Sequence, residues 1–409
     1  MKLSLKLDNA TDFLKYLLII SFYYMAYRYP LQISDSDTSP TYIDTPFSLQ
    51  VLKYLLFFLL CGVFFVKSLL KKRGFRVPGN RLFDFLFFSF IFLVPILYDV
   101  LTTGIEFFET GLFFGALLLF FLSSDREVDV SRAERWISVF LVLSILVELI
   151  QLALFFGVGR LPALAYSNSI SVRFGSIWDD PNGFAFMLTF LIPFVLAKRI
   201  NLLTKAALFV VLSIMMLLTQ SLTGIFAFAV ALIVGVFTLG LLLKDSTYWK
   251  QGLFLLLSYV FTAILVFSVV MNLEIVKEFL LLKSGSIEDH IELMGVIHQA
   301  SALNYLGLGP KGVVSETGYI NILYNLGIVY FLAYLVMLGY TLFRLVRAIR
   351  DNQGRRGVEV YYGAFFFVLS FAIGMGNLPL DGVFPLNLIL VVCLLFTYGR
   401  LAPSEPGLR

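Results

Sequence analysis

Apolar segments of roughly 20 residues recur along nearly the whole chain and are separated by short polar connections. Each is long enough to cross a bilayer as an α-helix, and in hydrocarbon every backbone amide must bond within its own segment. The pattern therefore predicts an all-α, polytopic helical membrane protein of about twelve transmembrane helices. The expected spans are 11–28, 48–69, 82–101, 107–124, 137–158, 183–198, 205–220, 224–243, 252–273, 319–343, 358–377 and 385–400.

Composition agrees with this pattern. Of the 409 residues, 59% are hydrophobic and only 14% are charged, a balance that a soluble domain could not cover with water-compatible groups. No separable soluble domain is visible, so 1–409 is expected to form a single integral membrane domain. Its largest polar insert, 274–318, is expected to be a partly helical loop. The first apolar segment is not followed by a small-residue cleavage site and is expected to remain as a helix.

Orientation follows from the distribution of Lys and Arg, which accumulate on the cytoplasmic side. With a cytoplasmic N-terminus, 24 of the 31 basic residues fall on that side, and both termini lie there. This topology accounts for the net charge of +4, so no nucleic-acid partner is expected. The seven basic residues left on the outer side are Arg28, Lys53, Arg160, Arg173, Lys277, Lys283 and Lys311.

Two outer segments carry candidate chemistry, 159–182 and 274–318. In the first, Asp180-Pro181-Asn182 is typical of a helix start with Pro181 at the first helical position. Arg173 precedes it, and two interpretations remain open. The arginine could extend along the membrane surface to keep its charge in water, or its guanidinium could bind phosphate bidentately.

The second outer segment contains both histidines of the chain, His290 and His298. Their spacing places them roughly 80° apart on a helix, which does not match a helical zinc pair, and no metal or cofactor is expected. His290 follows two carboxylates and could be a solvated residue, a general base or a ligand for a substrate hydroxyl. Lys311 ends a glycine-rich stretch and could meet a phosphate. Glu316 could stabilise the start of the next helix or take part in chemistry.

Two carboxyl groups are singled out within the predicted spans, and one of them, Asp99 near the outer end of the third span, could be satisfied by hydrogen bonds between helices. Glu148 lies near the middle of the fifth predicted span, close to Gln151. A carboxyl group at this depth is costly and is therefore a functional candidate, although it could also be satisfied by hydrogen bonds between helices.

Three stretches together resemble the bacterial O-antigen polymerase and O-antigen ligase family. The first runs from Arg173-Phe174-Gly175-Ser176 into Asp180-Pro181-Asn182-Gly183. The second is Leu218-Thr219-Gln220-Ser221-Leu222-Thr223-Gly224. The third is His290, Leu306-Gly307-Leu308-Gly309 and the run from Ser315 to Ile328. The resemblance covers about residues 150 to 345, in the family's order.

The resemblance implies a metal-independent, inverting membrane glycosyltransferase of the GT-C type. It would act on undecaprenyl-diphosphate-linked oligosaccharide at the periplasmic face of the bacterial inner membrane, in O-antigen, capsule or exopolysaccharide synthesis. Arg173, assisted by Arg160 or Lys311, would bind the leaving diphosphate. His290 or Glu316 would accept the proton of the attacking hydroxyl. Asn182, His298 and Glu148 are secondary candidates, and a flippase and a chain-length regulator are expected partners.

The sequence departs from the family pattern at two positions. Leu222 stands where the family often has arginine, and Glu316 stands where the ligase branch tends to have histidine, which favours a polymerase. A ligase that transfers glycan to lipid A core or to a protein is the alternative within this class. A transporter or flippase for lipid-linked oligosaccharide is the alternative of another class. It is disfavoured because polar residues collect in outer loops rather than at the bilayer midplane.

Overall fold

The structure is a computed structural model of the whole chain. It describes residues 79–102, 128–158, 165–168, 171–176, 181–243, 317–378 and 386–400, together with the single positions 55, 59 and 66.

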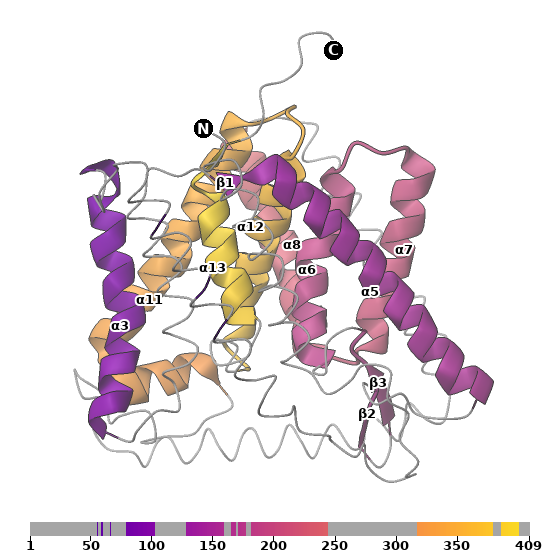
Figure 1. Cartoon of the computed structure of the whole chain (residues 1–409), viewed down its shortest axis with the longest axis horizontal. Helices are drawn as coiled ribbons and strands as arrows, with labels where there is room; N and C mark the ends of the chain where they lie inside the picture. The colour runs from indigo at the N-terminus through magenta and orange to yellow at the C-terminus, as the bar shows by residue number, and fades with distance from the viewer. Residues whose placement is uncertain are drawn as a thin grey trace.

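The described part is mostly helical, as predicted (Figure 1). A short 3-10 helix, Gly79–Arg81, leads into the first of the longer helices. These are α3 (Leu82–Thr102), α5 (Val130–Val158), α6 (Pro181–Ala197), α7 (Leu202–Leu218), α8 (Leu222–Leu243), α11 (Gly318–Asp351), α12 (Val358–Gly374) and α13 (Leu386–Phe396). Each coincides with one predicted span. The spans 11–28, 48–69, 107–124 and 252–273 lie outside the described ranges, apart from single positions.

Two small strand pairs were not predicted. β1 (Val128–Asp129) pairs in parallel with β4 (Gly399–Arg400), joining the start of α5 to the segment after α13. β2 (Ala165–Asn168) pairs antiparallel with β3 (Ser171–Phe174), with Tyr166 opposite Arg173. The second pair lies within the predicted outer segment 159–182 and carries its candidate arginine.

Two helices form the centre of the described bundle. α6 and α12 make the most extensive helix–helix contact and are buried along most of their length. Helices that are apolar all round belong in such a position. The surrounding helices instead expose large apolar side chains on their outer faces, including Leu143 on α5, Ile214 on α7, Phe237 on α8 and Val336 on α11. Outer faces of this kind suit hydrocarbon rather than water.

Three of the described helices are long and apolar enough to cross a membrane, by length and composition. They are the segments Ala133–Gly157, Leu222–Leu242 and Gly318–Asp351. Four shorter apolar helices accompany them: Leu82–Pro95, Pro181–Ala197, Leu202–Leu218 and Val358–Gly374. These helices are compatible with the helical membrane protein that the sequence predicts.

Helix α11 is two helices joined at a kink. Gly327 there has φ 85° and ψ 168°, a combination open to glycine almost alone. In Figure 1 the first part of α11 runs across the lower end of the bundle before the chain turns upward. The kink therefore turns the first part of α11, Gly318 to Leu326, away from the direction of the long second part.

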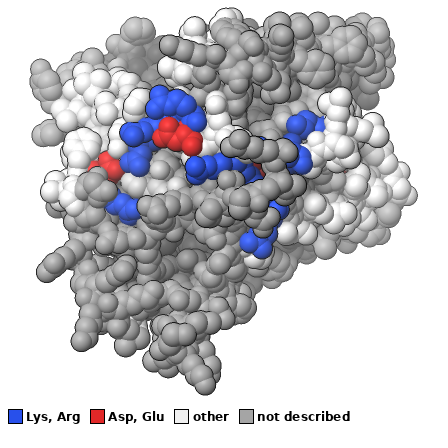
Figure 2. All heavy atoms as spheres, turned by 90° about the horizontal axis from the view of Figure 1, so that it is seen from above, with Lys and Arg blue, Asp and Glu red and all other residues white. Residues whose placement is uncertain are grey.

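Basic side chains gather at the upper end of the bundle (Figure 2). Exposed arginines from the end of α11 and the α11–α12 turn lie there, as do Lys198 and Arg199 after α6. Lys198 Nζ forms an ion pair with Glu134 Oε1 of α5 at 2.7 Å, and Arg356 approaches the other oxygen of the same carboxylate at 3.6 Å. Arg199 donates a hydrogen bond to the carbonyl oxygen of Gly354. These contacts bring the basic ends of α5, α6, α11 and α12 together.

Candidate functional site

The first candidate site lies at the opposite end of the bundle and is centred on Arg173. Its Nε donates to the backbone oxygen of Thr219 at 2.8 Å, and its Nη2 donates to Asn182 Oδ1 at 2.8 Å. These bonds join β3, the first turn of α6 and the end of α7. We call this meeting point the Arg173 junction. Two bonds in different directions fix the plane of the half-buried guanidinium.

The segment that carries Arg173 is held against α5 on one side. The ring of Phe174 packs edge-on against Phe155 of α5, with ring centroids 5.7 Å apart. Two residues later, Ser176 Oγ donates to the backbone oxygen of Ser144 at 2.6 Å, and Gln151 Nε2 donates to the oxygen of Ser176 at 2.7 Å. Ser176 is fully buried and has φ 54°, a left-handed conformation that these contacts hold in place.

The turn between α7 and α8 forms the second side of the junction. Gln220 in this turn also has a left-handed backbone, with φ 51°. Ser221 Oγ accepts a bond from the backbone nitrogen of Gly224 at 3.2 Å and so caps the first turn of α8. A Cβ at Gly224 would come within 2.6 Å of the Cβ of Ala185, so the glycine allows α8 to approach α6 closely.

The third side is formed by the starts of α8 and α11 and the end of α12. Asn377 Nδ2, just beyond α12, donates to Thr223 Oγ1 at 2.5 Å. The backbone nitrogen of Tyr319 donates to the oxygen of Met375 at 3.2 Å, and its hydroxyl donates to the oxygen of Ala372 at 2.5 Å. The described parts of all three stretches singled out in the sequence therefore lie at one end of the bundle, linked through α12.

Charge distinguishes this end from the other. Within the described ranges, Arg173 is the only Lys or Arg at this end, whereas the others lie at the basic end or in the first two turns of a helix that begins there. Of the seven basic residues expected on the outer side, Arg173 is the one that lies within the described ranges.

The structure describes three of the predicted site residues. It brings Arg173 and Asn182 into direct contact, and it confirms Pro181 as the first residue of α6. Glu148 is buried on α5 next to Ser176, three residues beyond Arg173. The other predicted site residues lie outside the described ranges: His290, Glu316, Arg160, Lys311 and His298. The described ranges contain no group of three or more His, Cys, Asp or Glu side chains able to hold a metal ion.

Two members of the junction were not predicted as site residues. The backbone oxygen of Thr219 carries no sequence signal of its own, because any residue has a carbonyl group. Asn377 lies far along the chain from the recognised stretches. Asn377 is a polar amide at the end of an apolar helix and could have been singled out on that ground, but its contact with Thr223 could not have been.

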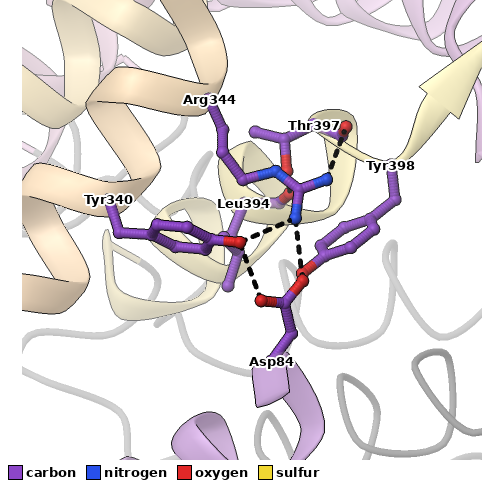
Figure 3. A network of polar contacts seen from close by, with 6 residues as sticks. All are labelled: Asp84, Tyr340, Arg344, Leu394, Thr397 and Tyr398. Atoms are coloured by element: carbon purple, nitrogen blue, oxygen red, sulfur yellow. Dashed lines mark hydrogen bonds and ion pairs between the residues drawn. The ribbon is translucent and has the colours of Figure 1, made fainter. Parts of the chain in front are cut away.

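A second polar cluster lies at the basic end and was not predicted (Figure 3). Asp84 of α3 accepts bonds from Arg344 Nη1 at 2.8 Å, from the Tyr340 hydroxyl at 2.7 Å and from the Tyr398 hydroxyl. The guanidinium of Arg344 also lies 4.0 Å from the centroid of the Tyr398 ring and donates to the oxygen of Thr397 at 3.4 Å. These bonds join α3, α11 and the segment after α13. Every charged group in the cluster has a partner, so we interpret it as a structural clamp.

Comparison with known proteins adds no assignment: no protein-family model, no curated protein and no solved structure matches this chain.

Proposed function

We propose that this chain is a membrane glycosyltransferase that polymerises lipid-linked oligosaccharide repeat units. The donor would be an oligosaccharide on undecaprenyl diphosphate, used at the periplasmic face of a bacterial inner membrane. Both termini would then be cytoplasmic. The product would be an O-antigen, capsule or exopolysaccharide chain.

The single observation that carries this proposal is the Arg173 junction. The described parts of three sequence stretches that resemble the O-antigen polymerase family meet at one end of the bundle, although they are separated by long apolar segments. The only basic residue described at that end is held there by hydrogen bonds to two of the helices that meet. A guanidinium whose plane is already fixed loses little conformational entropy when it binds an anion.

The proposed chemistry follows from the leaving group. Breaking the bond between sugar and lipid diphosphate develops negative charge on the diphosphate, which a fixed cation stabilises. Arg173 would supply that cation, with Arg160 or Lys311 assisting. His290 or Glu316 would take the proton of the attacking sugar hydroxyl. No nucleotide site is required, because the lipid carrier already activates the sugar.

The departure at Leu222 bears on this assignment. The family often has arginine there, whereas Leu222 is the first residue of α8 and is half exposed. Arg173 of β3 instead reaches the adjacent turn and bonds to Thr219. Arg173 is therefore the described residue on which the diphosphate role depends.

The test is reconstitution of the purified full chain in nanodiscs with undecaprenyl-diphosphate oligosaccharide, without nucleotide or added metal. A ladder of lengthened lipid-linked glycans is the expected product. Arg173→Ala should abolish the ladder while leaving the protein folded. The matched control is Arg199→Ala, which removes an exposed arginine at the opposite end. It should leave the ladder intact.

Other outcomes identify the alternatives. Transfer of glycan only after lipid A core is added would indicate a ligase. If neither assay yields a glycan product and the lipid-linked sugar moves across the bilayer of liposomes, the proposed enzymatic activity would be contradicted and a transporter indicated. A normal ladder from Arg173→Ala would remove the diphosphate role from this residue.

A further inference from the structure

One face of α5 carries three fully buried polar side chains within a segment long and apolar enough to cross a membrane. Ser144, Glu148 and Gln151 have relative exposures of 0%, 1% and 0%. Their spacing of four and three residues places them on one side of the helix, above one another. We call them the α5 polar cluster.

The cluster faces Ser176, which contacts it along its whole length. Ser176 bonds to the backbone of Ser144 at one end and receives a bond from Gln151 at the other. Glu148 lies between them on the helix, and its carboxyl group is close enough to the backbone of Ser176 to interact with it electrostatically. Neither carboxyl oxygen reaches a donor within hydrogen-bonding geometry. The three side chains therefore lie on one buried face of α5, beside the segment that follows Arg173.

This face of α5 is rich in oxygen atoms that lack partners. Ser144 Oγ, both carboxyl oxygens of Glu148 and Gln151 Oε1 are all buried without a hydrogen bond. The amide nitrogen of Gln151 and the hydroxyl of Ser176 are already used. A buried oxygen without a partner costs about 1–3 kcal/mol, and more if charged, so four on adjacent side chains imply a bound group that satisfies them together.

We infer that the α5 polar cluster is a binding site for a monovalent metal cation. Carboxylate, amide and hydroxyl oxygens are the hard ligands that alkali and alkaline-earth ions take. Burial alone favours the neutral acid form of Glu148, so cation binding releases its proton. The resulting carboxylate and a single positive charge make the site neutral. A divalent ion would leave a net charge in an apolar segment, which is costly. The same ion would stabilise the position of Ser176 and of the segment that carries Arg173.

The evidence for this site does not depend on the proposed glycosyltransferase, because it is the burial and the missing hydrogen bonds of side chains on α5. Its test accordingly measures stability and ion binding rather than glycan synthesis. The full chain is purified in nanodiscs, and its thermal unfolding is followed at equal ionic strength in sodium, potassium and N-methyl-D-glucamine chloride.

The expected result is an unfolding midpoint that rises by several degrees in sodium or potassium over the organic cation, with a saturable dependence on concentration. Glu148→Gln keeps the shape and should abolish the difference between salts. Glu134→Gln is the matched control, since Glu134 is an equally buried carboxylate of α5 that is paired with Lys198. It should retain the difference.

A second measurement covers the case in which Glu148→Gln does not fold. Binding of radioactive sodium to the wild-type protein is measured with unlabelled sodium and potassium as competitors. Saturable binding supports the site. Equal midpoints in all three salts together with no saturable sodium or potassium binding, or a salt effect that survives in Glu148→Gln, would overturn it. Buried water would then be the occupant of the cluster.

Discussion

Removal of the Asp84 carboxylate should destabilise the protein at its basic end. Asp84 accepts three hydrogen bonds and has a side-chain exposure of 6%, while its partner Arg344 is 23% exposed. Asp84→Ala leaves a largely buried guanidinium and two tyrosine hydroxyls without their shared acceptor. Breaking a buried ion pair costs about 3–5 kcal/mol. Arg344 keeps contacts to Tyr340 and Thr397 and partial access to solvent, so we expect the lower end, about 3 kcal/mol.

The assay is denaturant-induced unfolding in mixed micelles, followed by near-ultraviolet circular dichroism. Asp84→Asn retains an acceptor of the same shape and should cost less, about 1–2 kcal/mol. Arg344→Leu and the double variant complete a cycle. Because the two side chains are in direct contact, the double variant should be more stable than the sum of the single changes predicts, by about 2 kcal/mol. Additivity within about 0.5 kcal/mol would refute the reasoning, as would a wild-type stability for Asp84→Ala.

Three further predictions concern other described contacts. Glu134→Gln weakens two ion pairs at the basic end and should lower the unfolding free energy by about 1–2 kcal/mol in the same assay; no change would show that these pairs contribute nothing. Gly327→Ala places a side chain at φ 85° and should cost about 1–3 kcal/mol. Gly339→Ala in the same helix meets no neighbour and should be neutral or slightly stabilising, so equal effects would contradict the kink argument. Asn182→Ala removes one of the bonds that orient Arg173 and should slow glycan polymerisation about tenfold, with a loss of only about 1 kcal/mol in unfolding free energy. Arg173→Ala should abolish polymerisation.

The positions of the helices could be predicted from the sequence, because an apolar run of sufficient length has no other stable form in hydrocarbon. All eight longer helices in the described ranges lie at predicted spans. The observed helix ends differ from the predicted ones where a helix extends past its apolar residues. α5 begins at Val130 rather than 137, and α11 continues to Asp351 rather than 343. The helical hydrogen-bond pattern continues into charged turns beyond the apolar core.

The sequence also indicated which end of the bundle is basic and singled out Arg173 and Asn182 as neighbouring candidates. The numbers of Lys and Arg in each loop can be counted from the sequence without knowing how the helices pack. Short-range contacts are similarly accessible, since Arg173 and Asn182 are nine residues apart. The kink at Gly327 was missed, because a glycine within an apolar helix is common and its backbone angles depend on what packs around it.

Only the tertiary structure decided which distant residues meet. Arg173 and Thr219 are 46 residues apart, and Asp84 and Tyr398 are 314 apart. An apolar span does not reveal which of its faces contacts another helix, because lipid and protein accept the same side chains. The three stretches that resemble the polymerase family could be found one at a time, but the meeting of their described parts at one end depends on the packing of α6, α8, α11 and α12. The sequence thus determined where the helices lie along the chain and which connections between them are basic. The packing of those helices decided which residues meet at the candidate site.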